Sequence, residues 1–137
     1  MTDGSVGVRP TGPAPTCRHD KGHIFLNAAF GVRGLVTSLS VIGHVMVGSD
    51  LLDWAGVAQV MSVRPARIAG LSGQGRPIAV GEPANLTLVD PSATVTVDRD
   101  ASVSLSRNNP WHGRTLTGTV YATLLRGRPT VLKGALV

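Results

Sequence analysis

The first clear pattern in the chain is an apolar stripe that begins just after Gly34. Its members recur at intervals of four, three and four residues: Leu35, Leu39, Ile42 and Met46. This spacing places them on one face of an α-helix. Gly48-Ser49 predicts the end of that helix, because glycine readily takes the left-handed conformation found just beyond helix C-termini.

A second helix is predicted to begin at Asp53, whose carboxylate can accept hydrogen bonds from the free N–H groups of the first turn. Its apolar stripe consists of Trp54, Val57, Val60 and Met61. Arg64-Pro65 predicts a break, because proline disfavours the α conformation in the preceding residue. We then expect a short third helix from Pro65 to Ala69, ended by Gly70.

Beyond Leu71 the pattern becomes that of strands. Leu86, Leu88 and Val89 indicate a short strand that Asp90-Pro91 should terminate, and residues 94–97 alternate between polar and apolar as a half-buried strand does. The polar stretch 104–114 should be a loop. Two final strands, Thr119 to Leu125 and Thr130 to Leu132, flank Arg126-Gly127-Arg128, which suits a hairpin turn.

Helices come first and strands last, which predicts an α+β fold and not a run of βαβ units. Residues 1–16 contain three prolines and three glycines with no periodicity, so we expect a flexible leader. Residues 17–71 are predicted to form a helical segment and residues 72–137 a β-rich domain.

Composition narrows the class of protein. The net charge of +5 suggests an acidic partner, but the 13 Lys and Arg residues are scattered from Arg9 to Lys133 and form no basic stripe. This distribution argues against nucleic-acid binding. A single cysteine, Cys17, excludes an internal disulfide and fits a reducing compartment. Without a secretory signal, and with the apolar run Val41–Val47 too short to span a bilayer, the sequence predicts a cytoplasmic protein that does not enter membranes.

Four groups of segments carry a specific order of residues. They are Leu51–Trp54 with Arg64–Leu71, Gln74–Pro77 with Gly81–Pro91, Ser106–Gly113, and Val120–Gly127. In this order and spacing they resemble the end of a bacterial dihydroorotase of the amidohydrolase superfamily. The resemblance is close over residues 31–137. It implies the last helices of an amidohydrolase (β/α) barrel followed by a small β-rich C-terminal domain.

The resemblance also indicates where catalytic residues would stand. Family members carry a Thr-Asp-His-Ala-Pro-His motif whose aspartate is the general acid/base and whose last histidine helps to hold substrate. Here Gly12 occupies the aspartate position and Thr16 the histidine position. A remnant of the family's substrate loop follows at Phe30 and Gly31, with Phe30 in place of the usual proline. Arg33 then replaces an apolar residue, and Val36 replaces the usual Glu or Gln.

The resemblance implies zinc in the parent family, held by a His-x-His and other ligands that lie upstream of anything present here. The chain has four histidines and no His-x-His: His19, His23, His44 and His112. His19 and His23 are four apart, but the intervening Gly22 and the polar setting disfavour the helix that a shared metal would need. We expect His44 to be partly exposed and His112 to be structural or exposed.

The aspartates have structural explanations too. Asp53 caps a helix, Asp90 makes a turn with Pro91, and Asp98 and Asp100 should lie in a solvated turn. The sequence therefore predicts no catalytic residue, metal site or cofactor for this chain.

Three functional hypotheses remain open. The first is a C-terminal fragment of a dihydroorotase, the cyclic amide hydrolase of pyrimidine biosynthesis, that is inactive alone. The second is a non-catalytic interaction module, such as a scaffold for aspartate carbamoyltransferase. The third is one part of a split dihydroorotase completed by the missing barrel portion. In each case, apolar helix faces and a free sheet edge should favour self-association.

Overall fold

The computed structural model describes residues 32–102 and 106–137, and in it the first stripe forms two consecutive helical pieces. These are α2 (Ser38–Ile42) and the π-helical η1 (Gly43–Val47). Leu35 is not part of the stripe: it lies in the turn before α2 and is 68% exposed. The predicted end at Gly48-Ser49 is confirmed, since η1 stops at Val47 with Gly48 as its C-cap. The left-handed conformation expected of Gly48 is wrong: it has φ −64°, and the left-handed residue is Asp50, at φ 55°.

The second helical segment begins as the sequence predicted. The Asp53 carboxylate accepts a hydrogen bond from the Gly56 N–H at 2.7 Å and caps α3 (Trp54–Ala58). From there the chain continues without a break through the π-helical η2 (Gln59–Val63) and α4 (Arg64–Ile68).

The predicted break at Arg64-Pro65 is therefore wrong. Arg64 keeps a helical conformation, and its N–H bonds to the Gln59 carbonyl five residues back. We attribute this to the wider π turn, which moves the preceding carbonyls away from the proline ring. The predicted stop at Gly70 is confirmed: at φ 67° it lets the Leu71 N–H reach the Ala66 carbonyl at 2.9 Å.

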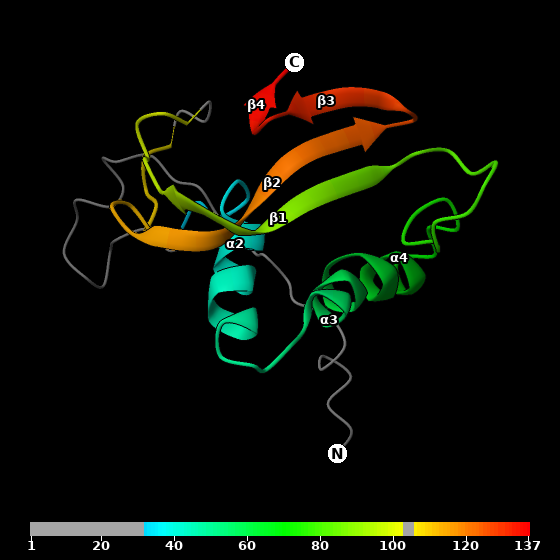
Figure 1. Cartoon of the computed structure of the whole chain (residues 1–137), viewed down its shortest axis with the longest axis horizontal. Helices are drawn as coiled ribbons and strands as arrows, with labels where there is room; N and C mark the ends of the chain where they lie inside the picture. The colour runs from blue at the N-terminus through cyan, green and yellow to red at the C-terminus, as the bar shows by residue number, and fades with distance from the viewer. Residues whose placement is uncertain (1–31, 103–105) are drawn as a thin grey trace, which may run out of the picture.

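The strands form one antiparallel sheet in the order β1-β2-β3-β4 (Figure 1). Their bounds are β1 (Leu86–Thr96), β2 (Thr115–Leu125), β3 (Arg128–Leu132) and β4 (Ala135–Leu136). β1 runs through Asp90-Pro91, so the predicted termination there is wrong. Residues 91–93 instead bulge opposite Gly118, which frees Pro91 from the need to donate to the ladder.

Two hairpin turns organise the end of the chain. Arg126 and Gly127 have φ values of 51° and 80°, which both central positions of a type I′ turn require, so the predicted hairpin is confirmed. Lys133 and Gly134, at φ 50° and 77°, repeat the same turn and produce β4. Sequence analysis missed this strand, although the Lys-Gly pair was its signal.

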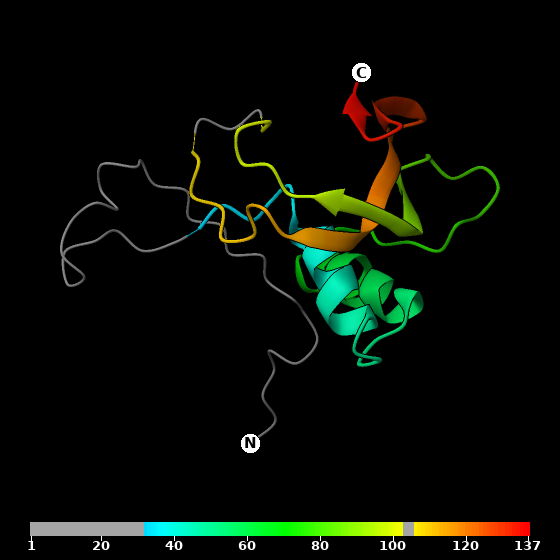
Figure 2. The same ribbon diagram turned by 60° about the vertical axis from the view of Figure 1, so that its left-hand side comes forward.

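The helices lie on one side of the sheet, and both views of the molecule show this arrangement (Figures 1 and 2). α2 packs against β2, where Leu116 is 1% exposed. Other buried apolar residues are Val57, Val60, Ala66, Val97 and Ala122. The Trp54 ring packs against the backbones of Gly43 and Gly118. The α+β class is confirmed, while the division at residues 17–71 and 72–137 stays a prediction.

Within the described ranges, no helix combines the length and the apolar character needed to cross a membrane.

Candidate functional site

The fold brings together two segments that the family resemblance singled out. The Arg33 N–H donates to the Asn108 carbonyl at 2.8 Å, and the Arg33 guanidinium donates to the Ser106 carbonyl at 3.3 Å. The chain just after the substrate-loop remnant is thus fastened to the loop at Ser106–Gly113. Phe30 and Gly31 themselves lie outside the described residues.

The Ser106–Gly113 loop is shaped by its own hydrogen bonds. Asn109 Oδ1 accepts from the Trp111 N–H at 2.9 Å, and the Arg114 guanidinium lies 5.7 Å from the centre of the Trp111 ring. Two further bonds join this region to the residue after β1: Gly113 N–H to the Val97 carbonyl and Val97 N–H to the Arg114 carbonyl. The loop therefore holds Asn109 in a fixed place beside the sheet.

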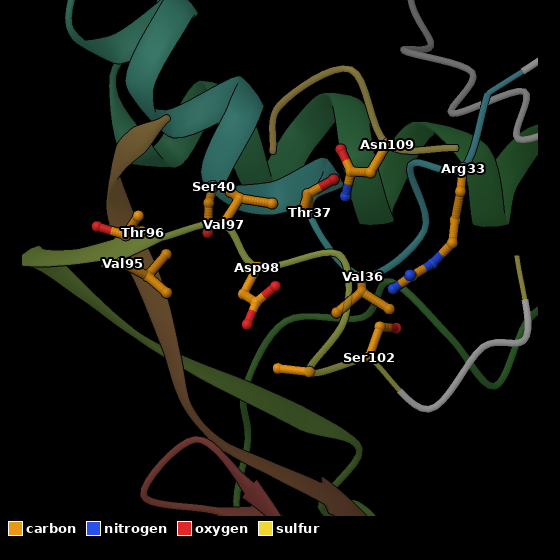
Figure 3. Close-up of a pocket in the computed structure, with 11 residues that line it drawn as sticks. Arg33, Val36, Thr37, Ser40, Val95, Thr96, Val97, Asp98, Ser102 and Asn109 are labelled. Carbon is orange, nitrogen blue, oxygen red and sulfur yellow. The ribbon is translucent and has the colours of Figure 1, made fainter. Parts of the chain in front are cut away.

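A cavity of about 230 Å³ lies between this loop, the start of α2 and the end of β1 (Figure 3). We name it the Arg33 cavity. Its polar lining includes Arg33, Thr37, Ser40, Asp98 and Asn109, and its apolar lining includes Val36, Val95, Val97 and Ala101. Arg33, Ser40 and Asn109 are all buried.

Asp98, which also lines the cavity, and Asp100 lie in a solvated turn, as the sequence predicted. The Asp100 N–H donates to Asp98 Oδ1 at 2.8 Å. His112 is exposed, and its Nδ1 accepts a hydrogen bond from the Arg99 N–H at 3.2 Å, which gives it the structural role that the sequence predicted. His44 is also exposed.

Asp90 stands at the start of the bulge of β1, where it pairs with Thr119. Its Oδ1 accepts from the Ser92 hydroxyl and from the N–H groups of Ser92 and Ala93. These bonds to the ionised form, the hydroxyl bond foremost, hold the pKa of Asp90 below its ordinary value. Its role is to shape the strand.

Potential metal ligands do not come together among the described residues. No three or more of their His, Cys, Asp and Glu side chains gather into a group that could hold an ion. The zinc that the family resemblance implies therefore finds no donor set within residues 32–102 and 106–137. Four of the residues singled out in the sequence lie outside these ranges: Gly12, Thr16, His19 and His23.

A second hollow, which the sequence analysis did not predict, is much larger than the Arg33 cavity. This apolar groove of about 1010 Å³ runs between α3–η2, the segment 73–85 and the sheet. Trp54, Val57 and Met61 line one wall and Val120 and Leu125 another. The signal for one wall was present in the helical stripe, but the groove itself exists only because the stripe and the strands face each other.

Solved structures show the class of protein to which this fold belongs. D-hydantoinase (dihydropyrimidinase) from Thermus sp. matches 91% of the chain at a TM-score of 0.80 and 22% identity, using 28% of its own length. L-hydantoinase (dihydropyrimidinase) from Arthrobacter aurescens matches 82% at a TM-score of 0.74 and 29% identity, using 25% of its length. The fold is therefore one found in the hydantoinase-type amidohydrolases.

Sequence relatives make the assignment more specific, although no family model matches the chain. Dihydroorotase of Mycobacterium leprae is 52% identical over 130 residues, which is 95% of this chain and 30% of that protein. Dihydroorotase of Streptomyces coelicolor is 47% identical over 136 residues, 99% of this chain and 32% of its own length. The chain is homologous to the C-terminal part of bacterial dihydroorotases, and it spans about 30% of the length of these relatives.

Proposed function

We propose that this chain forms the closing part of a dihydroorotase-type cyclic amide hydrolase and has no activity alone. The observation that carries the proposal is the match of nearly the whole chain to less than a third of its dihydroorotase relatives. The structure supports the proposal further, because no metal-binding group is present among the described residues. Opening or closing a cyclic amide needs an activated water, a carboxylate to move its proton and a Lewis acid on the carbonyl.

In this proposal the chain's own contribution is to position other parts. The hydrogen bonds from Arg33 to Asn108 and Ser106 fasten the end of the substrate-loop remnant to the loop at Ser106–Gly113. That anchor would fix the start of the described chain, at Arg33, against this loop. Arg33 is accordingly a positioning residue and not a catalytic one.

The apolar groove is the surface that would receive the rest of the protein. Its lining places Trp54, Val57 and Met61 opposite Val120 and Leu125, and the exposed Ile78 lies at the same hollow. Contiguous apolar surface of this kind on a protein is often a site of interaction. The groove supports a role in which another polypeptide segment packs against these residues.

The first test is turnover by the purified chain. With zinc added, we expect neither ring opening of dihydroorotate nor ring closure of carbamoyl-aspartate. Product formation above a no-protein control would contradict the proposal.

The degraded motif provides a second test, made with the chain bound to the remaining part of the Mycobacterium leprae enzyme. We expect the wild-type complex to stay inactive, because Gly12 supplies no carboxylate to move a proton. The double substitution Gly12→Asp with Thr16→His should raise turnover above that of the wild-type complex. Full activity of the wild-type complex would show that Gly12 does not stand at the catalytic position, and would favour a split enzyme.

The same groove also favours a second candidate function, that of a non-catalytic interaction module. A scaffold for aspartate carbamoyltransferase would use this surface without needing metal ligands. Co-purification of that enzyme with the chain, lost when Met61 is replaced by Lys, would support the scaffold. Binding to a dihydroorotase barrel instead would support the first proposal.

A further inference from the structure

Arg33 is a buried cation without a matching anion in the described residues. The residue is only 5% exposed, and its guanidinium makes one hydrogen bond to the part of the chain that the structure describes, the 3.3 Å contact to the Ser106 carbonyl. No Asp or Glu within residues 32–102 and 106–137 forms an ion pair with it. Arginine stays protonated under all ordinary conditions, and buried charges are normally paired.

The remaining N–H groups of this guanidinium border the Arg33 cavity. Figure 3 shows the side chain extending beside Val36 in the hollow that Asp98 and Ser102 also reach. A guanidinium presents its donors as a planar fork, which fits the two oxygens of a carboxylate. The cavity thus contains a guanidinium positioned to pair with a carboxylate.

Two neighbouring groups add donors on the same lining. The Oδ1 of Asn109 is occupied by the Trp111 N–H, so the amide NH₂ is the part of this side chain left for the cavity. Ser40 is 9% exposed, and its hydroxyl forms no hydrogen bond with another described residue. The polar lining around Arg33 is therefore equipped mainly to donate to an acceptor.

The volume of the cavity and the charge of its lining indicate which hydrogen-bond acceptor it could hold. A volume of about 230 Å³ corresponds to about eight waters at their share of the liquid. Asp98 lines the same cavity and would repel a doubly charged phosphate more strongly than a singly charged group. The valine and alanine side chains of the lining suit a short aliphatic portion.

We propose that the Arg33 cavity is a binding site for a monocarboxylate. Its oxygens pair with the Arg33 guanidinium, and the Asn109 amide and Ser40 hydroxyl donate to them. The carboxylate comes either from a side chain of the polypeptide that completes the protein or from a small free acid. Only the first source rests on the proposed function.

The test is a titration of the full chain with sodium acetate, followed by ¹⁵N NMR at the Arg33 Nε–Hε and the Asn109 side-chain amide. We expect saturable shifts at both, absent with sodium chloride at equal ionic strength. Arg33→Met should abolish the shift at the Asn109 amide and Arg33→Lys should weaken it, whereas Arg128→Met, at an exposed arginine of β3, should leave both shifts unchanged. Equal shifts with chloride, no shift with acetate, or unchanged amide shifts in Arg33→Met would overturn the site.

A second arm identifies the source. In the complex with the remaining part of the Mycobacterium leprae dihydroorotase, loss of acetate binding assigns the carboxylate to that polypeptide, and retained binding assigns it to a small acid. Because the titration needs neither zinc nor substrate, its failure is separate from that of the proposed function. A chain that proved catalytically active alone would still be able to bind acetate.

Discussion

At the scale of single residues, local chemistry was predictable and long-range burial was not. The Asp53 cap follows from the sequence because its partner, Gly56, lies three residues away. The burial of Arg33 depends on Ser106, 73 positions further along, and no periodicity near Arg33 signals that contact. The same is true of Trp54, whose contact with Gly43 and Gly118 depends on how the helices pack on the sheet.

The first prediction concerns this Trp54 contact. A Cβ at Gly43 would lie 2.8 Å from the Trp54 ring, closer than packed atoms allow. Gly43→Ala should therefore lower the free energy of unfolding by about 1–3 kcal/mol. Gly34→Ala is the matched control, since a Cβ there meets nothing within 4 Å. Urea unfolding followed by Trp fluorescence measures both, and equal stability of the two variants would refute the packing.

The second prediction follows from the lowered pKa of Asp90. A carboxyl whose folded pKa is depressed contributes stability above its unfolded pKa and loses it as pH falls through the folded pKa. Stability should thus decline from about pH 4 downward as Asp90 becomes protonated. Asp90→Asn keeps an oxygen for the Ser92 and Ala93 N–H groups but cannot titrate, so its thermal midpoint should fall less over this pH range. Parallel wild-type and variant curves would contradict this role.

At the scale of elements, both helix regions and every predicted strand exist, but two predicted breaks do not. Proline at position 65 and the pair Asp90-Pro91 are normally boundary signals. Here the π turn of η2 lets the helix continue through Pro65, and the bulge opposite Gly118 lets β1 continue through Asp90-Pro91. Both solutions depend on hydrogen-bond register, which packing of the helices on the sheet determines, so the sequence pattern alone does not reveal them.

The third prediction tests how the long helical segment begins. Asp53→Ala removes the acceptor for the Gly56 N–H and should reduce the free energy of unfolding by about 1 kcal/mol. Asp53→Asn retains a side-chain oxygen that can cap and should lose less. Helix content by circular dichroism and the urea midpoint provide the readouts. A larger loss in Asp53→Asn than in Asp53→Ala would argue against capping.

At the scale of the whole molecule, the order of segments carried more information than any single motif. The dihydroorotase relationship was predictable from four ordered groups of segments, and the sequence relatives confirm it over nearly the whole chain. The apolar groove was not predictable, because its walls come from parts of the chain that only the fold brings together. Its apolar lining is the main structural support for the proposal that another polypeptide segment packs against these residues.

The most direct measurement is therefore whether this chain binds the remaining part of the Mycobacterium leprae dihydroorotase through the groove. Light scattering on a sizing column should show a one-to-one complex with the wild-type chain. Met61→Lys, in the groove wall, should abolish the complex, while Val137→Lys, at an exposed apolar residue outside the groove, should preserve it. Separate elution of the wild-type chain and that polypeptide, or undiminished binding by Met61→Lys, would contradict the account.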